Sequence, residues 1–158
     1  MANLLMDELS RELKVRVTNG EILYKYRMPN IPARSVFIGD FIVVLKNGFT
    51  IYIECKKTEC NNISGINSEE KKHQVRFNLD LQKSPCSRHI YIFGYYKFKK
   101  KGLRKFKESS KYYLITDIVP CLDRKSIPEI FLRNNFIFDM TLPDIVTNLI
   151  NTYYRIVK

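Results

Sequence analysis

The sequence contains no tryptophan, only two histidines and four cysteines among its 158 residues. The cysteines, Cys55, Cys60, Cys86 and Cys121, form no C-x-x-C pair, and two histidines are too few to complete them, so a structural zinc site is not expected. No apolar run approaches the roughly 18–20 residues of a membrane span, and the first residues carry acid where a signal peptide carries base. We therefore expect an intracellular protein, cytoplasmic or nucleoid-associated, with reduced thiols and no membrane association.

Acidic residues are also scarce relative to basic ones. Lys and Arg number 27 against 16 Asp and Glu, which gives a formal net charge of +11. This surplus indicates a polyanionic partner, with nucleic acid as the first candidate; an anionic membrane surface and simple solubility are alternatives that charge alone does not separate. The chain is long enough to bury one core and too short for two, so we expect a single domain over residues 1–158.

Hydrophobic spacing and turn signals predict an α/β fold. Their order favours a mixed sheet of about five strands flanked by helices, with a core over about 8–118 and a C-terminal helical segment over about 126–158. The expected elements are a helix over 3–17, strands over 21–27, 41–45 and 49–56, a helix over about 67–83, strands over 89–96 and 112–118, and a final helix from about Leu142.

Two helix starts carry capping signals. The run Asn67-Ser68-Glu69-Glu70 fits a capping box for the second helix. Thr141, with Pro143 in the first turn and an acid three residues after the cap, fits the start of the last helix. Between the strands over 89–96 and 112–118, residues 97–107 supply seven positive charges, and we expect a basic excursion there.

The clearest hairpin surrounds the turn at residues 46–48. Strand alternation places Glu54 and Lys56 on one face of its second strand. A three-residue loop with Gly48 in the left-handed conformation sets Asp40 directly opposite Glu54. A two-residue turn at positions 47 and 48 would instead move Asp40 to the other face, so a site built on both carboxylates requires the longer loop.

Two carboxylates facing each other across a strand pair repel unless a cation lies between them. Hard oxygen ligands suit Mg²⁺, with Mn²⁺ as a substitute, and both ions also coordinate phosphate. A lysine beside them can orient a metal-bound water or stabilise charge on a phosphate, which predicts phosphodiester hydrolysis. The alternative is that Glu54 and Lys56 form a solvated pair on an exposed sheet face.

The residues resemble a known pattern. Gly39-Asp40, thirteen intervening residues and Glu54-Cys55-Lys56 match the PD-(D/E)xK signature of restriction-endonuclease-like nucleases. The order Tyr26-Arg27-Met28-Pro29-Asn30, Asp40-Phe41, Glu54-Cys55-Lys56-Lys57-Thr58 and a helix with His73-Gln74 is similar to the Holliday junction resolvases of the RecU and archaeal types over roughly residues 8–118. Asn30 stands where that family commonly has aspartate, and the long projection of the larger RecU proteins is absent.

The resemblance implies a magnesium-dependent endodeoxyribonuclease of recombination and repair that cuts four-way DNA junctions as a homodimer. The metal ligands would be Asp40, Glu54, the backbone carbonyl of Cys55 and an acid of the first helix, Glu12 or, in reserve, Glu8. Lys56 and Gln74 would act on the attacking water or a phosphate; an ordinary surface role for Glu12 and Gln74 is the alternative. No small-molecule cofactor is implied.

Other activities stay open from the sequence. A repair- or restriction-type nuclease on duplex or flap DNA would use the same residues, and a DNA-binding module without activity would share the fold. Phe98 and Phe106, within the basic stretch, either anchor it in the core or stack on a base. The residues expected to contact DNA phosphates are Arg27, Arg34, Lys57, Lys71, Lys72, Arg76, Lys99, Lys100 and Lys101.

Overall fold

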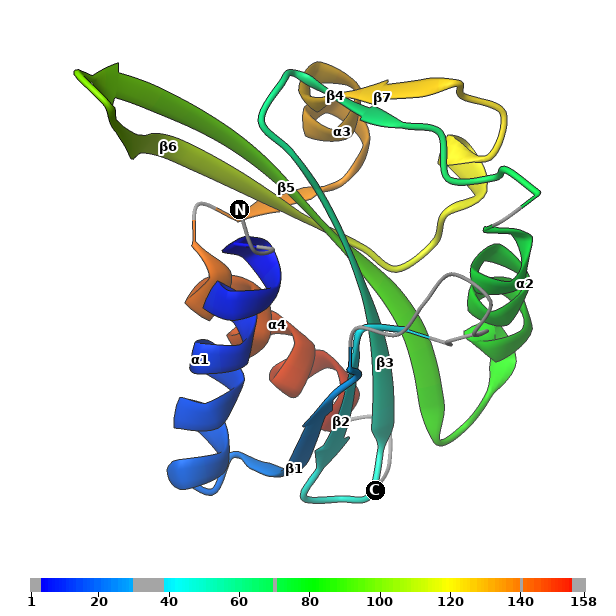
Figure 1. Ribbon diagram of the computed structural model, residues 1–158. Coiled ribbons are helices and arrows are strands. Elements are labelled where there is room, and N and C mark those ends of the chain that lie inside the picture. The colour runs from blue at the N-terminus through cyan, green and yellow to red at the C-terminus, as the bar shows by residue number, and fades with distance from the viewer. Residues whose placement is uncertain (1–3, 30–38, 70, 140, 155–158) are drawn as a thin grey trace.

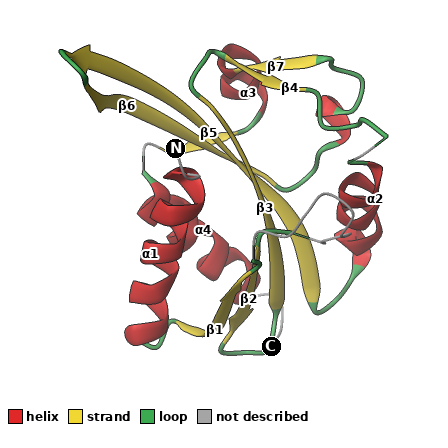
Figure 2. Ribbon diagram, in the orientation of Figure 1, coloured by secondary structure: helices red, strands yellow, loops and turns green. Residues whose placement is uncertain are grey.

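The computed structural model describes residues 4–29, 39–69, 71–139 and 141–154, arranged as helices against a twisted sheet (Figures 1 and 2). The helices are α1 (Leu4–Thr18), α2 (Lys72–Asp80), α3 (Glu129–Asn135) and α4 (Leu142–Tyr154), with short 3-10 turns at Leu81–Lys83 and Val119–Cys121. The strands are β1 (Ile22–Arg27), β2 (Phe41–Leu45), β3 (Thr50–Thr58), β4 (Asn62–Ser64), β5 (Ser87–Lys101), β6 (Arg104–Ile115), β7 (Ser126–Pro128) and β8 (Ile137–Asp139).

The main sheet is mixed, as the sequence predicts. Its order is β1-β2-β3-β5-β6-β8, and β4 pairs with β7 in a separate two-stranded sheet. β3 and β5 are parallel, with α2 in the crossover between them, and the other neighbouring strands are antiparallel. Within the described residues the main sheet has six strands, one more than the approximate expectation, because the short β8 adds to the edge of β6.

Each face of the sheet has its own core. α1 and α4 cover one face, and the expected leucine stripe of α1, Leu5, Leu9 and Leu13, is buried there. α2, α3 and the β4-β7 pair lie over the other face (Figure 1), where buried Tyr91 and Phe93 of β5 pack with the residues around β4 and β7. β3 therefore lies between two covered faces, and the carboxylate of Glu54 on it is buried.

The β2-β3 hairpin has the register that places the two carboxylates opposite each other. The amide of Gly48 donates to the carbonyl of Leu45 at 2.9 Å, and Leu45 pairs with Phe49 through a second 2.9 Å bond. Gly48 has φ of 86°, the left-handed conformation of the three-residue loop. Because paired positions sum to 94 along the ladder, Asp40 falls opposite Glu54. The longer loop is confirmed.

Asn47 ties this loop to the end of α4. Its side-chain amide donates to the backbone carbonyls of Tyr153 at 3.3 Å and Tyr154 at 3.0 Å, and its carbonyl accepts the amide of Phe49 at 3.1 Å. The rings of Phe49 and Tyr153 stack with centroids 5.0 Å apart. The turn is thus fixed both by its own glycine and by the last turn of α4.

Three local predictions are wrong. α2 begins at Lys72 after Lys71, whose side chain makes no capping bond, so the capping box at residues 67–70 does not start the helix. Residues 126–154 contain β7 and β8 as well as α3 and α4, because short segments there pair with strands from earlier in the chain. In the basic stretch 97–107 the two strands continue as a pair as far as Lys101 and Arg104, with a register shift between Lys97 and Phe98, so β5 ends later and β6 begins earlier than expected. At the last helix, the cap at Thr141 is confirmed by a 3.2 Å bond from the Asp144 amide.

The four cysteines are free thiols, with Cys55 and Cys121 buried. Among the described residues, no helix is both long and apolar enough to cross a membrane.

Candidate active site

Asp40 enters the site at the start of β2. Its backbone amide donates to the Ile53 carbonyl at 2.7 Å, and its carbonyl accepts the Met28 amide at 2.8 Å. The preceding Gly39 passes so close to β3 that a Cβ there would lie 3.0 Å from the Ile53 carbonyl oxygen. The side chain of Asp40 accepts the backbone amide of Cys55 through Oδ2 at 2.8 Å. Both the chain and the carboxylate are thereby fixed against β3.

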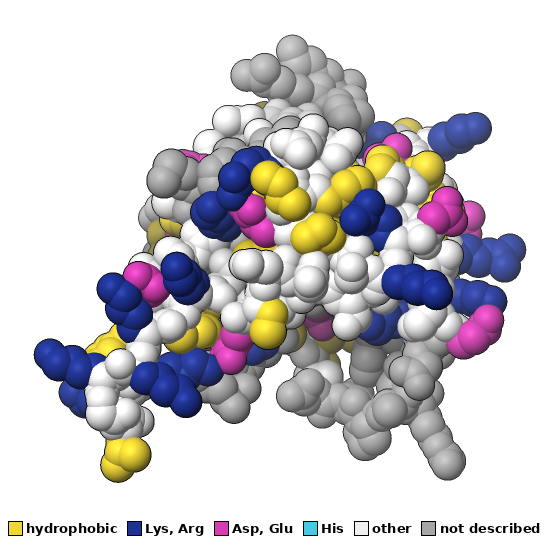
Figure 3. Space-filling view, turned by 90° about the horizontal axis from the view of Figure 1, so that it is seen from above, with side chains coloured by type: hydrophobic (Ala, Val, Ile, Leu, Met, Phe, Trp, Pro, Cys, Tyr) yellow, Lys and Arg dark blue, Asp and Glu magenta, His cyan; other side chains and the backbone are white. Residues whose placement is uncertain are grey.

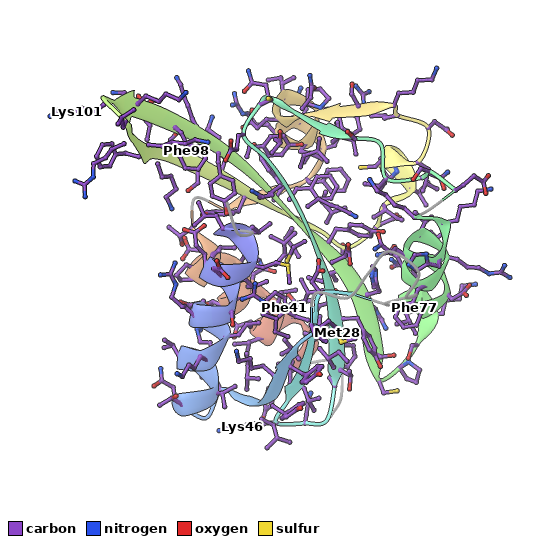
Figure 4. All side chains as sticks on the ribbon, viewed as in Figure 1. Met28, Phe41, Lys46, Phe77, Phe98 and Lys101 are labelled. Carbon is purple, nitrogen blue, oxygen red and sulfur yellow. The ribbon has the colours of Figure 1, made fainter. Side chains whose placement is uncertain are left out.

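Glu54, Lys56 and Gln74 form a connected group on the α2 face of β3. Glu54 is only 5% exposed, and its Oε1 lies 3.1 Å from Nζ of Lys56. The same Nζ donates to Oε1 of Gln74 on α2 at 3.2 Å. α2 is held over β3 by Phe77, whose ring meets Tyr52 edge-on at 5.1 Å; Figure 4 shows Phe77 directed from the helix toward the sheet. The alternative of a solvated pair on an exposed face is therefore excluded, since Glu54 is buried and the side chain of Lys56 is only 15% exposed.

The electrostatics of the carboxylates reflect burial and mutual repulsion. Burial, the largest cause, and the neighbouring Asp40 charge raise the pKa of Glu54 to about 7, although attraction to Lys56 and the hydrogen bonds to Lys56 and Gln74 lower it. Burial also raises the pKa of Asp40, against the Cys55 amide and the charges of Lys56 and Arg27. One lysine does not offset two desolvated carboxylates, so the pair retains capacity for further positive charge.

These donors fit a hydrated divalent cation. Within the described residues no group of three or more His, Cys, Asp and Glu side chains gathers as a metal site. Mg²⁺ is commonly held by one or two carboxylates while it keeps several waters, so Asp40 and Glu54 suffice as the anionic ligands. The backbone of Cys55 lies between them, already in contact with Asp40 through its amide.

The acids expected from the first helix are placed elsewhere. Glu12 pairs with Arg16, one turn along α1, at 2.8 Å. Glu8 accepts the hydroxyls of Tyr96 and Tyr112 and the ammonium of Lys107, at 2.7 to 2.9 Å. The structure therefore does not bring either acid to Asp40 and Glu54, because α1 packs on the opposite sheet face from Glu54 and turns these side chains toward α4 and β6.

Asp7 is the acid of α1 that sequence reasoning missed. Its Oδ1 accepts Nη1 of Arg27 at 2.9 Å, and Arg27 pairs in register with Phe41, the residue after Asp40. Arg27 also lowers the pKa of Asp40. Asp7 is therefore linked to the carboxylate pair through Arg27. The link depends on how β1 packs on α1, and no sequence motif signals it.

The residues expected to contact DNA occupy three regions. Lys71, Lys72 and Arg76 lie at or on α2, where Lys72 pairs with Glu69 at 2.5 Å and Arg76 approaches Asp80 at 4.0 Å. Lys57 is half-buried on β3, and Arg27 is engaged with Asp7. Lys99, Lys100 and Lys101 lie on the far end of β5. Arg34 lies outside the described residues.

The chain matches no protein-family model and no curated protein sequence. Among solved structures it is similar to Hjc, a Holliday junction resolvase from the archaeal hyperthermophile Archaeoglobus fulgidus. The TM-score is 0.49 at 11% sequence identity, over 88% of this chain and 98% of that chain.

Proposed function

We propose that this protein is a magnesium-dependent DNA endonuclease of the restriction-endonuclease-like type that cuts branched DNA, with four-way junctions as its substrate. The observation that supports this most directly is the group formed by Asp40, Glu54 and Lys56. A buried carboxylate, Glu54, and a partly buried one, Asp40, meet across a hairpin with a lysine 3.1 Å from Glu54. The motif resemblance of the sequence points to the same residues independently of their geometry.

Each residue has a task that its contacts support. Asp40 and Glu54, with the carbonyl of Cys55, would hold Mg²⁺, which supplies an acidic bound water and neutralises phosphate charge. Lys56 is held between Glu54 and Gln74, so its ammonium is positioned for a phosphate oxygen or for the attacking water. The amide of Cys55 fixes the orientation of the Asp40 carboxylate.

The surface around the site fits DNA rather than a small anion. Arg76 is exposed on α2 beside the site, and Lys99, Lys100 and Lys101 lie at the far end of β5. Phosphate contacts of this kind give affinity without sequence readout, which suits a structure-selective enzyme. Two symmetric cuts in a four-way junction require two sites, and we propose a homodimer for that reason.

The test is cleavage of a labelled synthetic four-way junction and of a linear duplex of the same sequence, in Mg²⁺ and in EDTA. Glu54→Gln removes the central carboxylate, and Glu69→Gln is the matched control because Glu69 is exposed and pairs with the exposed Lys72. Paired nicks on the junction alone, absent in EDTA and in Glu54→Gln but retained in Glu69→Gln, are expected.

Other outcomes separate the alternatives. Equal cutting of duplex and junction would reassign the protein to repair- or restriction-type cleavage. Junction binding with no cleavage by the wild type in Mg²⁺ or Mn²⁺ would overturn the catalytic assignment and leave a DNA-binding module of the same fold.

A further inference from the structure

The ends of β5 and β6 form an arm, defined here as residues 97–107, that extends beyond the rest of the sheet. β3 accompanies β5 only as far as Tyr95, and β8 contacts β6 only from Tyr112 to Leu114. Past those points the two strands pair only with each other among the residues that the structure describes, and the arm projects from the body (Figure 1). An isolated two-stranded ribbon is only marginally stable. The arm therefore adds little to the stability of the core, and its length calls for another explanation.

The tip of the arm presents a leucine. Lys101 pairs with Arg104, which leaves a two-residue turn of Gly102 and Leu103. Gly102 has φ of 63°, whereas Leu103 has negative φ, because positive φ occurs only at glycines among the described residues. This combination is that of a type II′ turn, which has glycine at its first central position. Leu103 therefore occupies the outer corner and is 107% exposed. Burying such a side chain is worth about 1.5–3 kcal/mol, so an apolar tip favours insertion into a partner.

Positive charge surrounds this leucine. Lys100, Lys101 and Arg104 make no ion pair within the described part of the chain, whereas Lys99 is paired with Glu108 at 3.0 Å. Figure 3 shows the Lys and Arg side chains gathered on the projecting arm, and Figure 4 marks Lys101 at its end. An apolar tip between unpaired cations fits a polyanion with an apolar interior, and stacked DNA has both properties.

The lower part of the arm is braced against the body. Lys105 donates to Glu59, just past the end of β3, at 2.7 Å, and its ammonium lies 4.5 Å from the ring centroid of Phe98. Lys107 donates to Glu8 of α1 at 2.7 Å. Phe98 packs against the α1 side of the core. Of the two roles expected for this ring, anchoring in the core and stacking on a base, the structure therefore shows anchoring. The bracing gives the tip a defined position relative to the carboxylates.

The distance along β5 from the carboxylates to the arm tip is similar to the length of one turn of duplex DNA. Glu54 lies beside Tyr91 in the β3-β5 register. From Tyr91 to Lys101 the strand rises about 33 Å, at roughly 3.3 Å per residue. One turn of duplex DNA is about 34–36 Å. Measured along β5, the carboxylates and the arm tip are therefore separated by about one helical turn of duplex DNA.

We infer that the arm enters the minor groove and inserts Leu103 between stacked bases, about one helical turn from the bond that the carboxylates cut. Lys100, Lys101 and Arg104 contact the phosphates on either side. Only the position of the cut in this inference rests on the proposed function. Insertion of Leu103 requires DNA binding but no cleavage. A lipid surface fits less well, because membrane-binding elements present a broad apolar face and this arm presents one leucine.

The experiment uses synthetic four-way junctions carrying 2-aminopurine at single positions stepped outward from the branch, bound by the full chain in EDTA. This base fluoresces when it is unstacked. Leu103→Ser removes the wedge, Leu103→Met conserves it, and Val119→Ser is the control because Val119 is an exposed apolar residue beyond the opposite end of β6. Anisotropy measures affinity on the same DNA. Sedimentation with phosphatidylserine–phosphatidylcholine vesicles tests the membrane alternative.

We expect a severalfold rise in fluorescence confined to adjacent positions, with wild type, Leu103→Met and Val119→Ser alike. Leu103→Ser should abolish the rise while weakening affinity by less than about tenfold. A rise that persists in Leu103→Ser, saturated binding with no rise at any position, or vesicle binding that depends on Leu103 without DNA unstacking would each overturn the inference. Base unstacking by a protein that does not cleave DNA in Mg²⁺ would support insertion of the arm and overturn only the proposed nuclease activity.

Discussion

The backbone amide of Cys55 donates to Oδ2 of Asp40 at 2.8 Å, and this bond joins the two strands that carry the carboxylates. It fixes the Asp40 side chain against β3 at Cys55, the residue that follows Glu54 in the chain. The amide also partly offsets the burial that raises the pKa of Asp40. A carboxylate held this way needs no rearrangement to accept a cation, which is the condition for a preorganised metal site.

Asp40→Asn should separate the structural role of Asp40 from metal binding. The amide oxygen of Asn can still accept the Cys55 N–H, and loss of the negative charge removes repulsion with Glu54. The free energy of unfolding in EDTA should therefore be unchanged or higher by about 1 kcal/mol. Thermal melting with and without Mn²⁺ checks this: Mn²⁺ should raise the Tm of the wild type and of the exposed control Asp80→Asn, but not that of Asp40→Asn. An equal Mn²⁺ shift in all three proteins would remove Asp40 from the ligand set.

The raised pKa of Glu54 predicts how stability depends on pH. The folded value of about 7 lies above the ordinary 4.5, so the folded metal-free protein binds this proton more tightly than the unfolded chain. The resulting stabilisation is complete below pH 4.5 and is lost as pH rises through 7, on the order of 1–3 kcal/mol. In Mn²⁺ the direction reverses, because the metal binds the deprotonated carboxylate.

Urea unfolding at steps from pH 5 to 8, in EDTA and in Mn²⁺, measures this dependence. Glu54→Gln lacks the titrating group, so its stability in EDTA should fall less over the same range. Parallel curves for wild type and Glu54→Gln would show that Glu54 is already ionised throughout, contrary to the expected proton binding.

The loop residue Asn47 should control the stability of the hairpin. Asn47→Ala loses the two bonds to the end of α4 and the bond from the Phe49 amide, and we expect a loss of about 1–2 kcal/mol in the free energy of unfolding. Lys46→Ala, at an exposed position of the same loop, should change stability by less than about 0.5 kcal/mol. Equal losses in the two variants, measured by urea unfolding, would indicate that the bonds to α4 contribute little.

The hairpin was predictable because its determinants are local: alternation of apolar residues sets the face of Glu54, and a glycine at position 48 marks the turn. Its register was left open between a two-residue and a three-residue loop, and the bond from the Gly48 amide to the Leu45 carbonyl selects the longer one. The site residues Asp40, Glu54, Lys56 and Gln74 are brought together as expected, since they lie on that hairpin and on the crossover helix that packs over it.

The rest depends on contacts that sequence spacing does not encode. The choice among acids of α1 is decided by how β1 docks on the helix, which links Asp7 to Arg27 and turns Glu12 toward Arg16. β4 and β7 are three residues each and are about sixty positions apart, so neither has a periodic pattern of its own. The lysine-rich arm has a charge pattern typical of a loop, yet β5 and β6 continue through it because each supplies the other's hydrogen bonds.

Tyr91 offers a test of the interior beside the site. It is fully buried next to Glu54 in the strand register, and within the described residues its hydroxyl has no hydrogen-bond partner. Removing an unsatisfied buried hydroxyl removes its desolvation cost, so Tyr91→Phe should raise the free energy of unfolding in EDTA by about 1 kcal/mol. Tyr95 is the matched control, because its hydroxyl donates to the Ile127 carbonyl at 2.7 Å; Tyr95→Phe loses this bond and should lower stability by about 1 kcal/mol. Urea unfolding of both variants decides the matter: a loss in Tyr91→Phe as large as that in Tyr95→Phe would mean that the hydroxyl is bonded in solution, with water in the space beside Glu54 as its partner.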